Sequence, residues 1–178
     1  TSDVTVGSEG SLMGTGTSTG DVTVNGIHAP GNSPGTQAVD GNLTYASASI
    51  FLWDLNAGTS DPGVASNSGT YDKVTVTGDL TGTGAVFQIV LGTNAFTDAF
   101  WNTDKDWTDI FSAGNTFDLG GIFTSFAGAG VASNGTVSGQ GSFTLNGTSL
   151  SWTAVPEPTS ALAGLLLGAG LLRRRRKP

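Results

Sequence analysis

The chain has 178 residues, enough for one domain with a buried core plus appended segments. It contains 28 Gly and 25 Thr but only 12% charged residues, which disfavours long helices and favours short strands joined by tight turns. Residues 1–155 carry two basic and thirteen acidic side chains, a net charge of −11, which argues against binding of nucleic acid or anionic lipid by this part. Cysteine is absent, which excludes disulfides and thiolate metal sites. We expect an all-β domain.

The first residues carry no export signal of basic and apolar residues. The sequence opens at Thr1 in the middle of a strand-and-turn pattern, so either a signal peptide has been removed or an N-terminal part is missing. We expect the latter, and therefore a β-rich extracellular repeat domain over residues 1–154 that is truncated at its N-terminus.

An internal repeat follows. The pattern V-x-G-x-L-T at Val39–Thr44 recurs 37 residues later at Val76–Thr81, and the apolar strands Ile50–Leu55 and Val86–Leu91 follow in the two copies. A weaker echo lies at Val137–Leu145. Because a fixed period is typical of stacked β-layers, the pattern favours a parallel β-helix or β-solenoid over the alternative, a β-sandwich.

The same region carries a family resemblance. Ala29–Gly35 reads A-P-G-N-S-P-G, Phe51–Leu55 reads F-L-W-D-L, and Tyr71–Leu80 reads Y-D-K-V-T-V-T-G-D-L. Together these stretches resemble the autotransporter-associated β-strand repeats of bacterial surface proteins, over about residues 21–92. The resemblance implies a β-solenoid surface region. Beyond the part that it covers, we expect the strands between Val137 and Thr153 to cap the stack.

One stretch matches a hydrolase motif by letters alone. Gly31–Gly35 fits G-x-S-x-G around Ser33, and His28, the sole histidine, is nearby. The nucleophile elbow needs the backbone N–H of the residue after the serine, and here that residue is Pro34, which has none. We interpret the stretch as a turn and predict no catalytic residue.

A Trp- and Asp-rich segment raises the question of calcium. Asn102, Asp104 and Asp106 are spaced like the first ligands of a calcium loop. Trp107 stands where such a loop needs glycine, so an EF-hand is excluded. The preferred interpretation is a solvated acidic loop pinned by Trp101 and Trp107, and a looser calcium site is the alternative. No cofactor is expected.

The C-terminal segment, residues 155–178, has three parts. Pro156, Glu157 and Pro158 precede the uncharged run Thr159–Leu172, and the basic cluster Arg173, Arg174, Arg175, Arg176 and Lys177 follows. As a helix the run is about 21 Å long, against a hydrocarbon core of about 30 Å. Because the arginines can snorkel, we expect one transmembrane helix over residues 159–172 with the basic tail 173–177 in the cytoplasm.

This layout resembles the PEP-CTERM sorting signal of Gram-negative bacteria. The resemblance implies export, transient insertion in the inner membrane, and recognition of Pro156, Glu157 and Pro158 by an exosortase-type membrane peptidase. Processing then releases the protein to the cell surface or the extracellular matrix. A plain tail anchor is the alternative.

We therefore expect a non-catalytic structural or adhesive protein of the cell surface or biofilm matrix, with extracellular polysaccharide as a candidate partner and no role in nucleic-acid binding. One alternative is a carbohydrate-binding module with Trp101 and Trp107 exposed in a groove. Another is a β-helix polysaccharide-degrading enzyme, which would need two Asp side chains converging from adjacent layers.

Overall fold

A computed structural model describes residues 2–31, 34–56, 71–92, 95–108 and 110–156. Within these residues the protein is all-β, as predicted, with only a short 3-10 helix, η1 (Ala99–Asn102), and a short α-helix, α1 (Leu119–Ile122). None of the helices in the described part is long and apolar enough to cross a membrane. The expected transmembrane run 159–172 lies outside the described residues.

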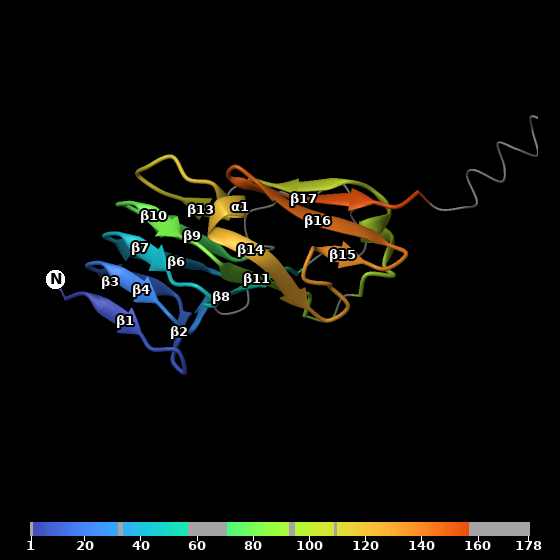
Figure 1. The fold of residues 1–178 in the computed structure, drawn as a ribbon. Coiled ribbons are helices and arrows are strands. Elements are labelled where there is room, and N and C mark those ends of the chain that lie inside the picture. The colour runs from blue at the N-terminus through green and yellow to red at the C-terminus, as the bar shows by residue number, and fades with distance from the viewer. Residues whose placement is uncertain (1, 32–33, 57–70, 93–94, 109, 157–178) are drawn as a thin grey trace, which may run out of the picture.

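Three parallel sheets form the N-terminal two thirds of the molecule (Figure 1). The first sheet contains, in spatial order, β1 (Val4–Val6), β4 (Val22–Val24), β7 (Leu43–Tyr45) and β10 (Leu80–Gly82). The second contains β2 (Ser11–Gly14), β5 (Ile27–Pro30), β8 (Ile50–Asp54), β11 (Ala85–Val90) and β14 (Phe123–Gly128). The third contains β3 (Gly16–Thr19), β6 (Thr36–Asp40), β9 (Lys73–Val76) and β13 (Phe111–Ser112).

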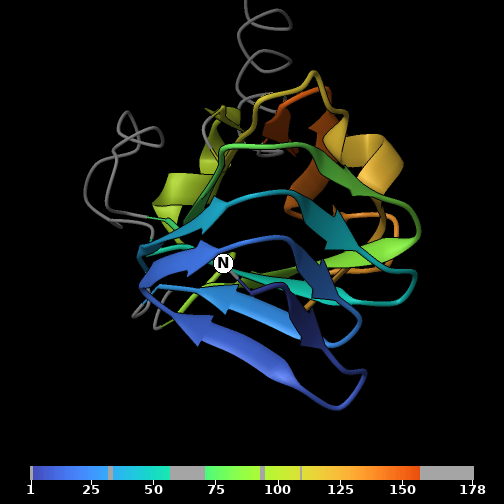
Figure 2. The same ribbon diagram turned by 90° about the vertical axis from the view of Figure 1, so that its left-hand side faces the viewer.

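The chain visits these sheets in a fixed order. β1, β2 and β3 form a first layer, β4, β5 and β6 a second, and β7, β8 and β9 a third, with each strand pairing in parallel with its counterpart in the next layer. Figure 2 views the molecule from its N-terminal side and shows the blue, cyan and green segments lying one above another.

The register confirms the repeat predicted from sequence. Leu43 pairs with Leu80 and Thr44 with Thr81, so the 37-residue offset is the step from the third layer to the fourth. The earlier layers are spaced differently, because Val22 pairs with Val4, 18 residues before it, and with Leu43, 21 residues after it. The repeated glycine has a steric reason: a Cβ on Gly41 would lie 2.4 Å from the carbonyl oxygen of Gly20 in the layer below. At Gly78, an added Cβ would meet the Asn42 side chain at 2.4 Å. Any side chain at these two positions would push the layers apart.

The core fills the space between the three sheets. Along β8, Phe51 and Trp53 are buried while Ile50, Leu52 and Asp54 are only partly covered. Side chains alternate between the two faces of a strand, so each strand sends every second residue inward. In the first layers the buried apolar side chains are aliphatic: Val6, Val22, Val24 and Val39. From β7 onward, aromatic side chains join the core.

A fourth, antiparallel sheet lies at the end of the stack away from the N-terminus (Figure 1). Its strands, in spatial order, are β12 (Lys105–Trp107), β17 (Ser149–Ala154), β16 (Gly141–Asn146) and β15 (Thr136–Val137). The expected capping strands in the 137–153 region are thus present. The weak repeat echo at Val137–Leu145 is not a further parallel layer, because β15 and β16 pair antiparallel with each other.

Candidate functional site

The predicted sorting motif begins just after β17, the last strand that the structure describes. β17 ends at Ala154, Val155 is 52% exposed, and Pro156 is also exposed. The backbone N–H of Val155 donates to the carbonyl oxygen of Gln140 at 2.8 Å, the last hydrogen bond before the motif. Glu157, Pro158 and the basic cluster 173–177 lie outside the described residues.

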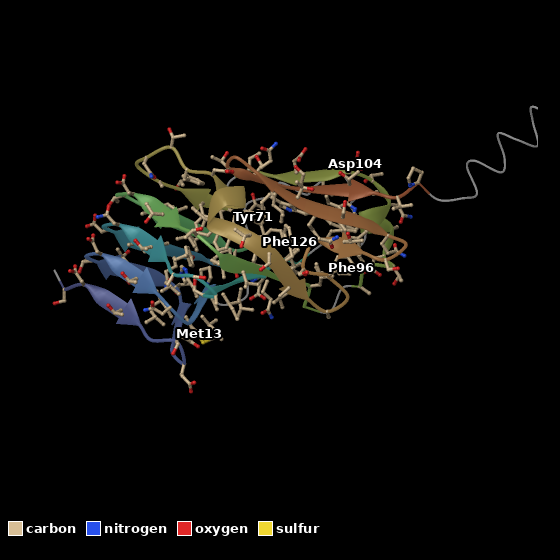
Figure 3. All side chains as sticks on the ribbon, viewed as in Figure 1. Met13, Tyr71, Phe96, Asp104 and Phe126 are labelled. Atoms are coloured by element: carbon tan, nitrogen blue, oxygen red, sulfur yellow. The ribbon has the colours of Figure 1, made fainter. Side chains whose placement is uncertain are left out.

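The acidic side chains of the calcium candidate fasten two strands together. Asp104 Oδ1 accepts a hydrogen bond from the Ala154 N–H at 2.9 Å, and Asp106 Oδ1 accepts one from the Ser151 hydroxyl at 2.5 Å. Both partners belong to β17. Figure 3 shows Asp104 at the outer edge of the antiparallel sheet. Across the part of the chain that the structure describes, no group of three or more His, Cys, Asp or Glu side chains is placed to hold a metal ion.

Lys105, between these two acids, points inward and is only 6% exposed. Its ammonium donates to the Thr103 carbonyl and hydroxyl oxygens and to the Asp104 carbonyl, and it lies 5.2 Å from the centre of the Phe100 ring. Burial lowers the pKa of Lys105, while the Asp104 carboxylate opposes this shift. The Thr103 and Asp104 oxygens thus bind the ammonium group of Lys105.

Trp101 and Trp107 are core residues, with 1% and 0% of their surface exposed. The ring of Trp107 packs edge-on against Trp53 at 5.3 Å, which joins the antiparallel sheet to the parallel stack. Both rings are buried, but the segment expected to be a solvated acidic loop forms η1 and β12. The carbohydrate-binding alternative required these two tryptophans to be exposed in a groove. That expectation is wrong, because neither ring reaches the surface.

His28 belongs to a buried polar network. On β5 it is fully buried, with Nδ1 2.5 Å from the Tyr45 hydroxyl and Nε2 2.5 Å from Gln37 Oε1. Because an amide oxygen can only accept, Nε2 carries the proton and Nδ1 accepts from the tyrosine. Burial lowers the pKa of His28 to about 4, although the bond to Gln37 opposes the shift. This histidine joins three strands inside the domain; Ser33 lies outside the described residues.

Asp72 is the carboxyl group with the most perturbed surroundings and was not singled out from sequence. It is buried, and its two oxygens accept hydrogen bonds from the Gly35 N–H at 2.7 Å and the Asp54 N–H at 3.0 Å. Burial raises its pKa to about 7, and the nearby Asp54 carboxylate adds to the shift, whereas the two hydrogen bonds oppose it. A raised carboxyl pKa beside a second acid is a pattern found in glycosidases. Here the Asp72 carboxyl group is buried, and its two hydrogen bonds link the backbones of adjacent layers, so its role is structural.

A ladder of Asp and Asn side chains was also missed. The side-chain oxygens accept hydrogen bonds from backbone N–H groups one layer further on. Asp3 accepts from the Asp21 N–H at 3.1 Å, Asp21 from the Asn42 N–H at 2.8 Å, and Asn42 from the Asp79 N–H at 2.8 Å. Asn115 ends the series by accepting from the Leu80 N–H at 3.1 Å. We call these residues the Asx ladder. The signal was available in the sequence, because an Asp or Asn directly precedes Val-Thr or Leu-Thr at each of the first four steps.

A half-open, mostly apolar pocket of about 450 Å³ lies beside the last residues of β11 and β14. Its lining residues are Gln88, Ile89, Val90, Leu91, Gly92, Ala95, Phe96, Gly128 and Ala129. Figure 3 shows Phe96 and Phe126 on the side of the molecule where the stack meets the antiparallel sheet. Gln88 supplies the one side-chain amide among these residues, so the pocket offers little chemistry beyond apolar contact.

No protein-family model, curated protein or solved structure matches this chain. Within the described residues, His28, Asp72 and the Asx ladder all hold neighbouring layers together. Pro156, by contrast, is exposed directly beyond the last strand.

Proposed function

We propose that this chain is an exported cell-surface or extracellular-matrix protein whose β-solenoid domain has a structural or adhesive role. In this proposal a PEP-CTERM-type signal over residues 155–178 directs the chain to an exosortase-type membrane peptidase. The helix 159–172 inserts transiently in the inner membrane, and the cluster Arg173–Lys177 sets its orientation.

The parallel registers support the solenoid. Strands of one sheet pair in parallel with their counterparts in the next layer, whereas the alternative β-sandwich is typically built from antiparallel strands. The Asx ladder satisfies backbone N–H groups at the turns before the first sheet, where adjacent layers would otherwise leave them unpaired. Such a stack provides a rigid, elongated surface, which suits a structural role.

One observation carries the sorting proposal: β17, the last strand that the structure describes, ends at Ala154, two residues before the Pro-Glu-Pro motif. A peptidase that acts beside the membrane needs an extended substrate strip, and the two prolines favour extended backbone. Val155 and Pro156 are exposed, which supports access to the start of the motif. The enzyme alternative lacks such support, because the most perturbed acid, Asp72, is enclosed.

The test replaces Pro156, Glu157 and Pro158 with alanine in cells that contain the peptidase. We expect full-length protein to accumulate in the inner membrane, as judged by fractionation and intact mass. The matched control, Thr153→Ala, changes an exposed residue of β17 outside the motif and is expected to be processed normally. Normal processing of the triple variant would refute the sorting proposal.

A further inference from the structure

A second pocket lies where the parallel stack meets the antiparallel sheet, between β14 and β16. It has a volume of about 310 Å³ and opens to solvent. None of the described residues that line it is charged, and the lining combines aromatic and polar side chains: Phe126, Phe143, Thr124, Ser133, Asn134 and Thr144. Figure 3 shows Phe126 at this junction. We call this site the junction pocket.

Phe126 is the last member of a row of aromatic side chains in the second sheet. Phe51 pairs with Phe87 in the next strand, and Phe87 pairs with Phe126. Phe51 and Phe87 are 0% exposed, and a strand lies on each side of both. Among the described residues β14 is the terminal strand of this sheet, and Phe126 is partly exposed. The row therefore ends with an aromatic ring that reaches the surface inside the junction pocket.

The backbone on both sides of this ring has an irregular, specific geometry. Thr124 forms a bulge in β14, because it has no pairing partner in β11, and it is exposed. Bulges of this kind re-aim a side chain and are common beside functional sites. Gly135 has a φ of +83°, and a Cβ there would clash with the Phe143 carbonyl oxygen and lie 3.0 Å from the Phe126 ring. Glycine thus allows the segment before β15 to pack against the ring.

Hydroxyl and amide groups next to the ring are available to a ligand. Within the described residues, no hydrogen bond uses the hydroxyls of Thr124, Ser133 and Thr144, and all three residues are exposed. Asn134 Oδ1 accepts from the Thr136 N–H at 3.1 Å, which orients the side chain and leaves its NH₂ group as a donor. The pocket therefore places neutral donors and acceptors beside an aromatic surface.

This combination matches the chemistry of a neutral sugar. A pyranose ring has an apolar face of C–H groups that packs on an aromatic ring, and its hydroxyls donate and accept hydrogen bonds. The volume is at the lower end of the range for ligand pockets, which suits a single sugar ring. Residues 1–155 carry a net charge of −11, which disfavours acidic sugars and phosphates.

Pairing of an extended peptide with β14 is a poorer match. The Phe126 N–H already donates to the Ser133 carbonyl oxygen at 2.9 Å, so this edge of β14 is partly occupied by the chain itself. The bulge at Thr124 interrupts the edge further, and bulges protect edge strands against pairing.

We propose that the junction pocket binds one neutral sugar unit of an extracellular polysaccharide. The pyranose ring lies against Phe126, and its hydroxyls bond with Thr124, Asn134 and Thr144. This inference rests on the proposed adhesive role and gives that role a binding site, which is separate from the buried Trp101.

Affinity electrophoresis of the full chain in non-ionic detergent tests the proposal. Native gels contain dextran, galactomannan, arabinoxylan or hydroxyethyl cellulose as neutral probes and alginate as the anionic probe, with serum albumin as the reference for gel viscosity. We expect at least one neutral polymer to retard the chain and alginate to leave it unaffected. Absence of retardation by all four neutral polymers, or equal retardation by alginate, would overturn the proposal.

A phenylalanine pair locates the binding. Phe126→Leu keeps an apolar side chain against Phe87 and Phe143 but removes the aromatic face, and we expect it to abolish the retardation. The matched control, Phe117→Leu, changes another partly buried phenylalanine that does not line the pocket, and we expect it to be retarded like the parent chain. Equal behaviour of the two variants would refute binding at the junction pocket.

A second variant separates binding from folding. Thr124→Ala combined with Thr144→Ala removes two exposed hydroxyls and leaves the core unchanged. We expect the retardation to fall at least several-fold while the far-UV circular dichroism is unchanged, and unchanged retardation would contradict the proposed contacts. These gels measure binding by the purified chain, whereas the sorting proposal is tested by processing in cells, so failure of one is distinguishable from failure of the other.

Discussion

The parallel stack and the antiparallel sheet differ in how far apart in the sequence their paired strands lie. In the parallel stack, Val4 pairs with Val22 and Leu43 with Leu80, so every pairing closes a long stretch of chain. In the antiparallel sheet, β16 turns directly into β17, and Asn146 pairs with Ser149 across two residues. Long-range pairing leaves many turns whose backbone groups need partners, and the Asx ladder supplies them. The local β16–β17 pairing needs less such help, whereas the distant strand β12 is fastened to β17 by Asp104 and Asp106.

The antiparallel sheet instead depends on aromatic packing. Trp152 lies within 4.8–5.8 Å of the ring centres of Phe96, Trp101 and Phe143. Its indole N–H donates to the Trp101 carbonyl at 2.9 Å. The four-stranded antiparallel sheet thus packs large aromatic side chains on one face, whereas the stack adds one smaller contact with each layer.

The largest effect is expected from Trp152→Ala. Removing this buried ring leaves a cavity among the aromatic side chains, and we expect a loss of about 3–5 kcal/mol in the free energy of unfolding. Urea denaturation followed by far-UV circular dichroism measures the loss. Thr153→Ala, on the exposed face of the same strand, serves as the control. A loss below about 1 kcal/mol would contradict the role given to the aromatic cluster.

The next effect concerns the buried network of the stack. His28 has a folded-state pKa of about 4, below its value of 6.5 in the unfolded chain, so only the unfolded chain binds a proton between these values. Stability is therefore lost as the pH falls from 6.5 toward 4, by about 3 kcal/mol for this group. Asp72 acts in the opposite direction, because its raised pKa, about 7, lets the folded state bind a proton first.

His28→Gln separates the two contributions. Glutamine does not titrate but keeps a donor and an acceptor for Gln37 and Tyr45. We expect the variant to lose the destabilisation between pH 6.5 and 4 and to gain stability over that range through Asp72. Denaturation curves at several pH values measure this. An unchanged pH profile would show that His28 is not neutral inside the folded domain.

The smallest effect tests one step of the ladder. Asn42→Ala removes the acceptor for the Asp79 N–H and the donor to Asp21, and we expect a loss of about 1–2 kcal/mol in the free energy of unfolding. Asn42→Asp keeps the acceptor but places two carboxylates together, so it should lose less than alanine at low pH and more at neutral pH. Equal free energies of unfolding for the parent chain, Asn42→Ala and Asn42→Asp would show that the ladder does not stabilise the stack.

Much of the fold was predictable because it depends on short patterns. The alternation in Ile50–Leu55, the glycine before Leu43 and Leu80, and the 37-residue repeat predicted strands, turns and the register between the third and fourth layers. The earlier steps, of 18 and 21 residues, were not predicted. The Val137–Leu145 echo misled, because glycine and threonine also suit a hairpin. The sorting motif is an order of residue types along the chain, and it stays a prediction.

The tertiary structure decided which side chains face water. Trp101 and Trp107 look like ligand-binding aromatics in a polar stretch, but strands distant in sequence bury them. Asp72 and His28 owe their perturbed pKa values mainly to burial, and their hydrogen-bond partners, 9 to 37 residues away, oppose the shifts; no local pattern contains either effect. Residue types and spacing by themselves determined that strands form and repeat, because backbone preference and steric fit are local. Burial and pairing depend on how the layers stack, because water is excluded only where neighbouring layers meet.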